Sequence, residues 1–148
     1  MGNGSEDAEV RAIEAVIARQ FRSLTWAPGA PGDWEGFAAG FLPGAALFPA
    51  ARPARAQTPQ AFVERMQGLA QTTLQALDET LLGTRIHVFG NLAVALAGNE
   101  LLENGTTTTR AVEAFLLIKD QGAWRIATQA WDVESEANPI PAELGARR

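Results

Sequence analysis

The chain has 148 residues, of which 47% are hydrophobic and 20% charged, and its formal net charge is −5 at neutral pH. This length suits a single domain, and the composition is that of a globular protein rather than a disordered one. The absence of cysteine excludes disulfides and thiolate chemistry, and the single histidine, His87, cannot build a typical transition-metal site. The acidic charge balance disfavours nucleic-acid binding.

Three further absences shape the expectations for cofactors and location. The chain contains no phosphate-binding loop or dinucleotide fingerprint, so we expect no nucleotide cofactor, and its single histidine and lack of cysteine lead us to expect no metal. Its first ten residues, MGNGSEDAEV, are polar and acidic, unlike a signal peptide. No apolar run reaches about 18 residues, the length of a membrane span. We therefore expect a cytoplasmic protein that contacts neither membrane nor nucleic acid.

The N-terminal part of the chain has a helical pattern. Apolar residues recur at spacings of three and four between Val10 and Leu24, which predicts an amphipathic helix over about 6–25. Asp33 is a suitable capping residue for a second, short helix, which we place over 33–42.

A proline-rich stretch separates these helices from a third one. Residues 43–57 contain several prolines and are expected to form a small irregular hairpin. Thr58 followed by Pro59 is a strong helix start, because the hydroxyl caps the helix and proline is favoured at its first position. We place this third helix over 58–78.

From about residue 80 the pattern becomes that of strands joined by tight turns. The turn sequences are Gly90-Asn91, Asn104-Gly105 and Asp120-Gln121-Gly122. The expected strands are 85–89, 92–103, 106–119 and 123–134. The prediction is a single α+β domain over 1–148, with a core at about 6–134 and an irregular tail at 135–148. In it, three N-terminal helices pack on a curved antiparallel sheet of four to six strands.

Several segments resemble the nuclear transport factor 2-like superfamily, and within it the SnoaL-like and ketosteroid-isomerase-like branch. They are Asp33-Trp34 with the following residues to Phe41, IHVFGNLAVALAG (86–98), and EAFLLIKDQGAWRIATQAWDVE (113–134). The resemblance covers about 8–134 and implies a cystatin-like cone with a pocket between helices and sheet. Because this fold hosts both enzymes and non-catalytic domains, the resemblance implies no single activity.

The residues depart from the known catalytic patterns of that superfamily. The steroid-isomerase pattern needs a carboxylate near Phe48-Pro49 and a tyrosine, and the chain has no tyrosine. The dehydratase pattern uses two histidines, and only His87 is present. The epoxide-hydrolase pattern needs an aspartate two residues after an arginine, and Arg85 lacks one. What remains is a single acid or base in the cone, for which Glu113, His87 and Asp132 are the candidates.

Alternation along the strands assigns side chains to faces of the sheet. Glu113 shares a face with Phe115 and Leu117, and the resemblance implies that this face lines the cone. We predict Glu113 as the catalytic residue, with His87 as a second candidate. The predicted ligand pocket consists of Phe21, Trp34, Asn99, Phe115, Leu117, Gln129 and Trp131. The alternative is that Glu113 faces solvent or pairs with Arg110 or Arg125 on the sheet surface.

Two classes of function follow. The first is a SnoaL-like domain that binds or transforms a small, mainly apolar molecule in the cone, with proton transfer as the chemistry. The second is a non-catalytic module for dimerisation or protein interaction. The opposite sheet face carries the apolar row Val112, Ala114, Leu116 and Ile118, which predicts a homodimer.

Overall fold

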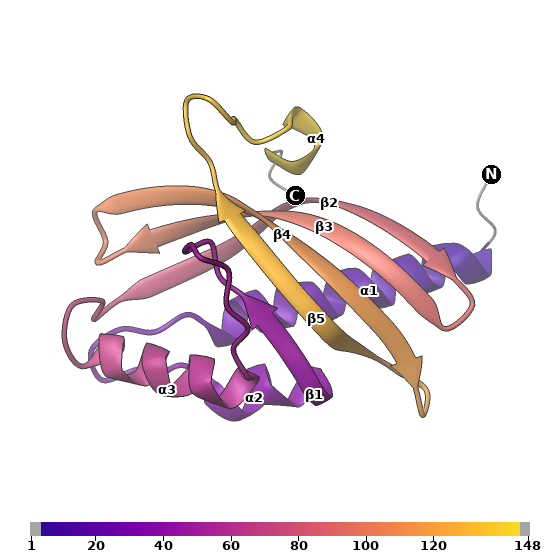
Figure 1. Cartoon of the computed structure of the whole chain (residues 1–148), viewed down its shortest axis with the longest axis horizontal. Helices are drawn as coiled ribbons and strands as arrows, with labels where there is room; N and C mark the ends of the chain where they lie inside the picture. The colour runs from indigo at the N-terminus through magenta and orange to yellow at the C-terminus, as the bar shows by residue number, and fades with distance from the viewer. Residues whose placement is uncertain (1–3, 146–148) are drawn as a thin grey trace.

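The computed structural model describes residues 4–145, which form helices and one sheet (Figure 1). The helices are α1 (Gly4–Ser23), α2 (Trp34–Ala39), α3 (Pro59–Ala70) and α4 (Ala142–Gly145). The strands are β1 (Phe41–Phe48), β2 (Leu77–Phe89), β3 (Leu92–Glu103), β4 (Thr107–Asp120) and β5 (Ala123–Val133). The first three residues of the acidic start and residues 146–148 of the expected tail lie outside the described part.

The five strands form one sheet in the order β1-β5-β4-β3-β2. β2 to β5 form the antiparallel meander that the turn sequences predict. β1 runs parallel to β5, with Leu47 opposite Gln129, so the sheet is mixed and the prediction of a purely antiparallel sheet is wrong. Residues 43–57 were expected to form an irregular hairpin, but the first part of this segment belongs to β1. Ala45 and Leu47 are buried in the core at alternate positions, as expected of a strand.

The helices differ from the predicted layer of three. α1 is long and buries Ile13, Ile17 and Phe21, as its periodicity predicts. α2 has only 6 residues; Asp33 caps it by accepting a hydrogen bond from the Gly36 N–H at 2.9 Å. α3 begins as predicted after Thr58 but has 12 residues. Along the chain, β1 separates α2 from α3. The sheet is therefore covered by one long helix and separate short ones, and not by three consecutive helices.

The segment that follows α3 is held by the turn between β3 and β4. The Asn104 side-chain oxygen accepts hydrogen bonds from the N–H groups of Gln75 and Ala76 at 3.0 and 3.2 Å. Its amide donates to the carbonyl of Thr73 at 2.9 Å. These bonds hold residues 73–76 in a loop. β2 follows this loop and begins at Leu77 rather than at residue 85.

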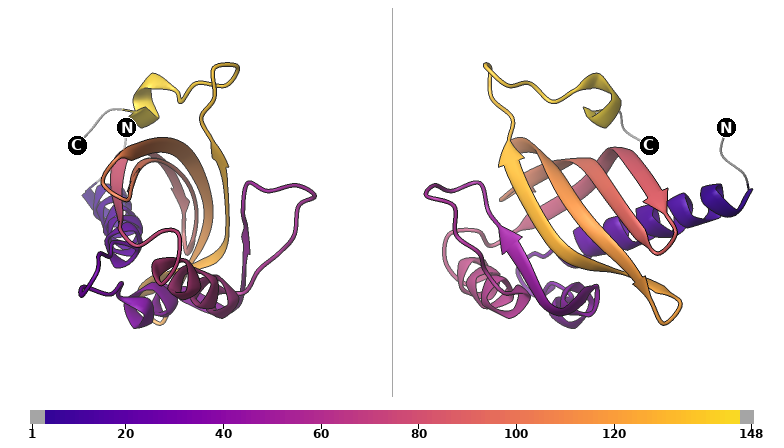
Figure 2. Two further views of the ribbon diagram at one scale, coloured as in Figure 1. Left: turned by 90° about the vertical axis from the view of Figure 1, so that its left-hand side faces the viewer. Right: turned by 45° about the vertical axis from the view of Figure 1, so that its right-hand side comes forward.

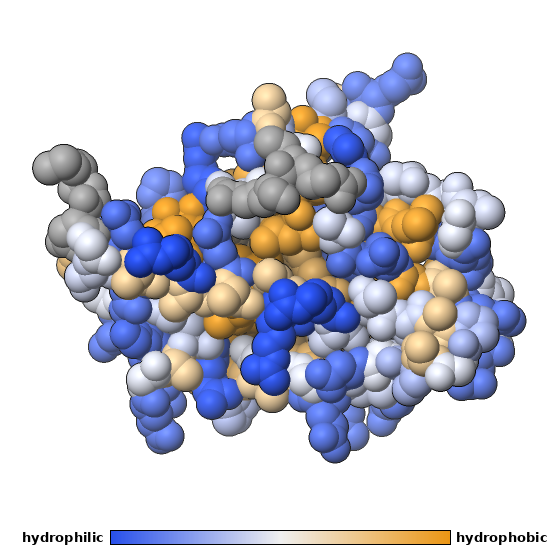
Figure 3. All heavy atoms as spheres, turned by 180° about the vertical axis from the view of Figure 1, so that it is seen from behind, coloured by the Kyte–Doolittle hydropathy of each residue, from blue (hydrophilic) through white to orange (hydrophobic). Residues whose placement is uncertain are grey.

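The sheet curls strongly, and α1, α2 and α3 close its open side (Figure 2). The core lies between them and includes Ile17 of α1, Leu117 of β4 and Ile126 of β5, each 0% exposed. The surface on the side where α1 lies is mostly hydrophilic, with separate apolar patches (Figure 3). None of the helices within residues 4–145 is both long and apolar enough to cross a membrane.

α4 packs against the outer, convex side of the sheet. The prediction of an irregular tail is therefore wrong for residues 142–145. A Cβ atom on Gly83 would overlap the backbone oxygen of Glu143, and a Cβ atom on Gly98 would overlap that of Leu144. The two glycines thus allow the backbone of α4 to approach β2 and β3 directly.

Candidate functional site

A cavity of about 330 Å³ opens between the concave sheet face and α3. Most of its wall is apolar, with Phe62 and Met66 contributed by α3 and Leu101 by β3. The cavity has four charged or ionisable residues in its wall. Arg65 and Glu103 lie at its margin, and two glutamates lie deeper inside. An apolar cavity with a few convergent polar groups is the usual form of a small-molecule site.

Four neighbouring strands each contribute a buried polar side chain to the wall of this cavity. They are Glu79 of β2, Asn99 of β3, Glu113 of β4 and Gln129 of β5. The register explains why they meet: Asn99 lies opposite Ala111, two residues before Glu113, and Gln129 lies opposite Phe115, two residues after it. Such diagonal neighbours on one face are within reach of long side chains.

These side chains form a buried hydrogen-bond network. The Asn99 amide nitrogen donates to both Glu79 and Glu113, at 2.6 Å each. The Gln129 amide donates to the other oxygen of Glu113. Gln129 also forms a reciprocal amide pair with Gln20 of α1, with both N···O distances 2.8 Å. All five residues are at most 6% exposed.

Burial changes the ionisation of both carboxyl groups. Desolvation raises the pKa of Glu113 from its ordinary value of 4.5 to about 7, although hydrogen bonds from Gln129, Glu79 and Asn99 oppose the rise. Desolvation also raises the pKa of Glu79 well above its ordinary range, and the negative charge of Glu113 raises it further. A carboxyl group with a pKa near 7 can exchange protons readily at physiological pH.

The structure brings together four of the predicted site residues: Glu113, Asn99, Gln129 and Trp131 all line the cavity. Glu113 neither faces solvent nor pairs with an arginine, because Arg110 pairs with Glu100 and Arg125 bonds to the carbonyl of Ala39. Phe21, Phe115 and Leu117 do not line the cavity. They pack in the core beyond it, with Phe21 and Phe115 in ring contact at 6.4 Å.

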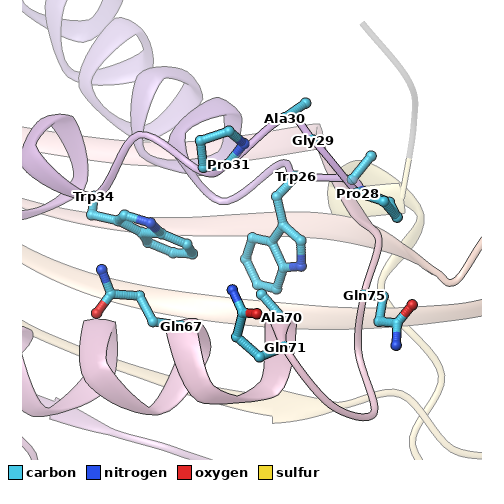
Figure 4. Close-up of a pocket in the computed structure, with 11 residues that line it drawn as sticks. Trp26, Pro28, Gly29, Ala30, Pro31, Trp34, Gln67, Ala70, Gln71 and Gln75 are labelled. Atoms are coloured by element: carbon cyan, nitrogen blue, oxygen red, sulfur yellow. The ribbon is translucent and has the colours of Figure 1, made fainter.

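The other two predicted residues lie elsewhere. Trp34 packs against Trp26, with ring centroids 5.3 Å apart, and borders a separate surface depression beside α3 (Figure 4). His87 is exposed on the outer face of β2, whereas its neighbours Ile86 and Val88 pack against the core. His87 therefore cannot act together with Glu113, and it lies outside the cavity.

Sequence reasoning missed Glu79 and Gln20. Glu79 lies just beyond the helix expected over 58–78, although the alternation Leu77, Glu79, Leu81 is a strand signal. Gln20 lies three residues after Ile17 and four before Leu24, which places it on the apolar side of α1. Within residues 4–145, no cluster of three or more carboxylate or imidazole groups could hold a metal ion.

No family model and no curated protein matches the sequence. Solved structures do match, and their coverage is nearly complete. A nuclear transport factor 2-like protein of unknown function from Pseudomonas putida superposes with a TM-score of 0.69 at 15% identity, covering 91% of this chain and 94% of that one. A candidate scytalone dehydratase from Novosphingobium aromaticivorans superposes with a TM-score of 0.70 at 14% identity, covering 94% of this chain and 93% of that one.

A protein of unknown function with a cystatin-like fold, from Nostoc punctiforme, gives a TM-score of 0.68 at 15% identity and covers 90% of this chain and 95% of that one. The chain has the nuclear transport factor 2-like, or cystatin-like, fold. At these identities the similarity establishes the architecture, and the chemistry has to be argued from the cavity itself.

Proposed function

We propose that this nuclear transport factor 2-like domain binds a small, mainly apolar molecule in the cavity and catalyses a proton transfer on it, with Glu113 as the proton-transferring group. The observation that carries the proposal is the position of Glu113, a buried carboxyl group on the wall of the cavity with a pKa of about 7. Catalytic acids and bases work best when their pKa lies near the working pH.

The surroundings of Glu113 suit such a role. Asn99 and Gln129 hold its two oxygens from different sides, so the carboxyl group has a fixed orientation. Phe62 and Trp131, in edge contact at 5.7 Å, supply aromatic surface on the cavity wall for an apolar ligand. Proton transfer at a carbon next to a carbonyl group is the simplest reaction that one carboxylate can promote there.

The test is deuterium exchange into small neutral ketones. Cyclohexanone, 2-tetralone and 6-hydroxy-1-tetralone are incubated with the protein in D2O, and the loss of the C–H signals next to the carbonyl is followed by proton NMR. With the wild type, we expect at least one ketone to exchange faster than it does in buffer alone. With Glu113→Gln, we expect the exchange rate of that ketone to equal the rate in buffer. Glu64→Gln, a change at an exposed position of α3, is the matched control. Equal exchange in the wild type and Glu113→Gln would refute the proposal.

The alternative, a dimerisation module, is favoured by a different observation. Near the β2–β3 turn the outer sheet face exposes Phe89, Leu92 and Val94, which are 85%, 47% and 50% exposed. Leu116 and Ile118 of the predicted row lie opposite Val94 and Leu92 and extend this patch. α4 covers the other end of this face at Gly98.

We propose that this patch forms a homodimer interface, which is compatible with a functional cavity on the inner face. The expected mass by light scattering at micromolar concentration is that of two chains. Val94→Glu is expected to give the mass of one chain, because a charge at the centre of an apolar interface opposes association. Leu102→Glu, at an exposed position outside the patch, is the control. A monomeric wild type would contradict the proposal.

A further inference from the structure

We infer that Glu79 and Glu113 form one acid–base pair with a single proton between them, and that the cavity consequently takes an uncharged ligand whose hydroxyl group bonds to Asn99. This rests on the proposed function and deepens it: it adds a second carboxyl group to the site and a chemical class to the ligand.

The geometry makes the two carboxyl groups a unit. One amide nitrogen, that of Asn99, bonds to both of them at 2.6 Å, so their oxygens are held close together. Each carboxyl group is 6% exposed, and two negative charges this close in a buried site cannot both be stable. One of the two groups therefore keeps its proton when the other ionises, as in other carboxylate pairs.

In the described part of the chain, no positive charge compensates the pair. Within residues 4–145, no lysine, arginine or histidine forms an ion pair with Glu79 or Glu113. From β5, Glu113 is bonded by the neutral amide of Gln129, which in turn pairs with the neutral amide of Gln20 of α1. The other charged side chains that line the cavity, Arg65 and Glu103, lie at its margin and carry opposite charges.

The hydrogen bonds decide which group holds the proton. Glu113 accepts from Asn99 and Gln129, and the carboxyl of Glu79 interacts with it as a third donor. Donors stabilise a carboxylate, so Glu113 carries the charge and Glu79 the proton. In the proposed reaction the C–H bond next to the ligand's carbonyl group breaks and its proton goes to Glu113. Glu79 gives its own proton to the carbonyl oxygen, so that an enol with a hydroxyl group forms. The pair holds one proton before the step, on Glu79, and one after it, on Glu113.

Asn99 supplies the argument for the ligand. Its side-chain oxygen has no hydrogen-bond partner although the residue is only 1% exposed. A buried acceptor without a donor is unfavourable, and Asn99 lines the cavity. A hydroxyl group can donate to this oxygen and accept from a protonated carboxyl at the same time. A carboxylate ligand has no proton to donate to this oxygen, and it would add a second negative charge beside Glu113.

The first experiment measures the pairing without any ligand. Carbon-13 NMR of the glutamate side-chain carboxyls is recorded against pH in the wild type, Glu79→Gln and Glu113→Gln. In Glu113→Gln the pKa of Glu79 is expected to fall by about one unit or more, because the charge that raises it is gone. In Glu79→Gln, where no partner carboxyl group remains, Glu113 is expected to titrate in a single step. Glu79 titrating at the same pH in the wild type and in Glu113→Gln would overturn the shared proton.

The second experiment measures the ligand class with three probes of similar shape, namely 2-naphthol, 2-methylnaphthalene and 2-naphthoate, by calorimetry at about pH 8. We expect 2-naphthol to bind about tenfold or more tightly than either of the others. In Glu113→Gln the preference for naphthol over naphthoate is expected to shrink towards one. Equal binding of naphthol and naphthoate to the wild type would overturn the ligand assignment.

Failure of the proposed function and failure of this inference give different results. If the carboxyl titrations are coupled but none of the three probes binds and no ketone exchanges, the shared proton is supported and the proposed binding function is refuted. If exchange depends on Glu113 but not on Glu79, and Glu79 titrates independently, the proposed function stands and this inference is refuted.

Discussion

The free energy of unfolding is expected to fall as the pH rises from about 5 to about 8, and Glu113→Gln is expected to remove roughly 3 kcal/mol of that fall. The carboxyl of Glu113 ionises near pH 4.5 in the unfolded chain and at about 7 in the folded protein. Between these values the folded state binds a proton that the unfolded state has released. The stability from this group is therefore complete below pH 4.5 and is lost as the pH rises through 7.

Glu79 contributes in the same direction. Its pKa is raised by burial and by the charge of Glu113, so its share of the loss also begins near pH 4.5 and continues until the pH passes its raised folded-state pKa. In Glu113→Gln, Glu79 is left without that charge but remains buried, and a smaller slope is expected to remain. The double variant Glu79→Gln, Glu113→Gln is expected to be nearly independent of pH over this range.

Urea unfolding at several pH values provides the measurement, with Glu64→Gln as a control for removal of a negative charge at an exposed site. The control is expected to keep the slope of the wild type. If Glu113→Gln also keeps that slope, the carboxyl of Glu113 ionises in the folded protein as it does in the unfolded chain, and its assignment as a proton-transferring group is lost.

Features set by neighbouring residues could be predicted from the sequence. The turn at Asn104-Gly105 requires positive φ at both residues, and the structure has 53° and 72° there, so the hairpin follows from the dipeptide. The buried face of α1 follows from the spacing of its apolar residues by three and four positions. The shared face of Asn99, Glu113 and Gln129 depends on alternation within well-bounded strands, and this is why three of the network residues were found.

Features set by distant contacts could not be predicted. β1 is a strand because it pairs with β5, which lies far along the chain, and nothing within residues 43–57 indicates that partner. β2 starts at Leu77 because Leu77 exchanges backbone hydrogen bonds with Trp26 at 2.8 and 2.9 Å, and so Glu79 was missed. Alternation along a strand also predicts on which face of the sheet a side chain lies, but not whether it lines the cavity or packs in the core. Phe115 and Leu117 share the face of Glu113, yet they lie in the core beyond the cavity.

Replacement of Gly98 by alanine is expected to lower the free energy of unfolding by about 1–3 kcal/mol and to release α4 from the sheet. Gly98 lies on the outer face of β3, directly beneath the backbone of Leu144. The obstacle to a Cβ atom is a carbonyl oxygen and not the flexible end of a side chain, so local rearrangement cannot relieve the overlap. Either the sheet distorts or α4 moves away.

Movement of α4 has a definite cost. Leu144 is 2% exposed in the native structure and would become exposed. The ion pair between Arg85 and Glu143, 3.1 Å apart, would be lost as well, although both side chains are about half exposed and the pair contributes little. The expected loss therefore comes mainly from the burial of Leu144 and from the close packing of α4 on β2 and β3.

Urea unfolding measures the stability of Gly98→Ala, and hydrogen–deuterium exchange of the peptide containing residues 140–145 reports the docking of α4. Gly68→Ala is the matched control, because Gly68 lies within α3 and a Cβ atom there meets nothing within 4 Å. That variant is expected to be more stable than the wild type by about 0.5–1 kcal/mol, since alanine has the higher helix propensity. Unchanged stability and unchanged exchange at 140–145 in Gly98→Ala would contradict the direct contact between α4 and β3, because alanine would then fit where the structure leaves room only for glycine.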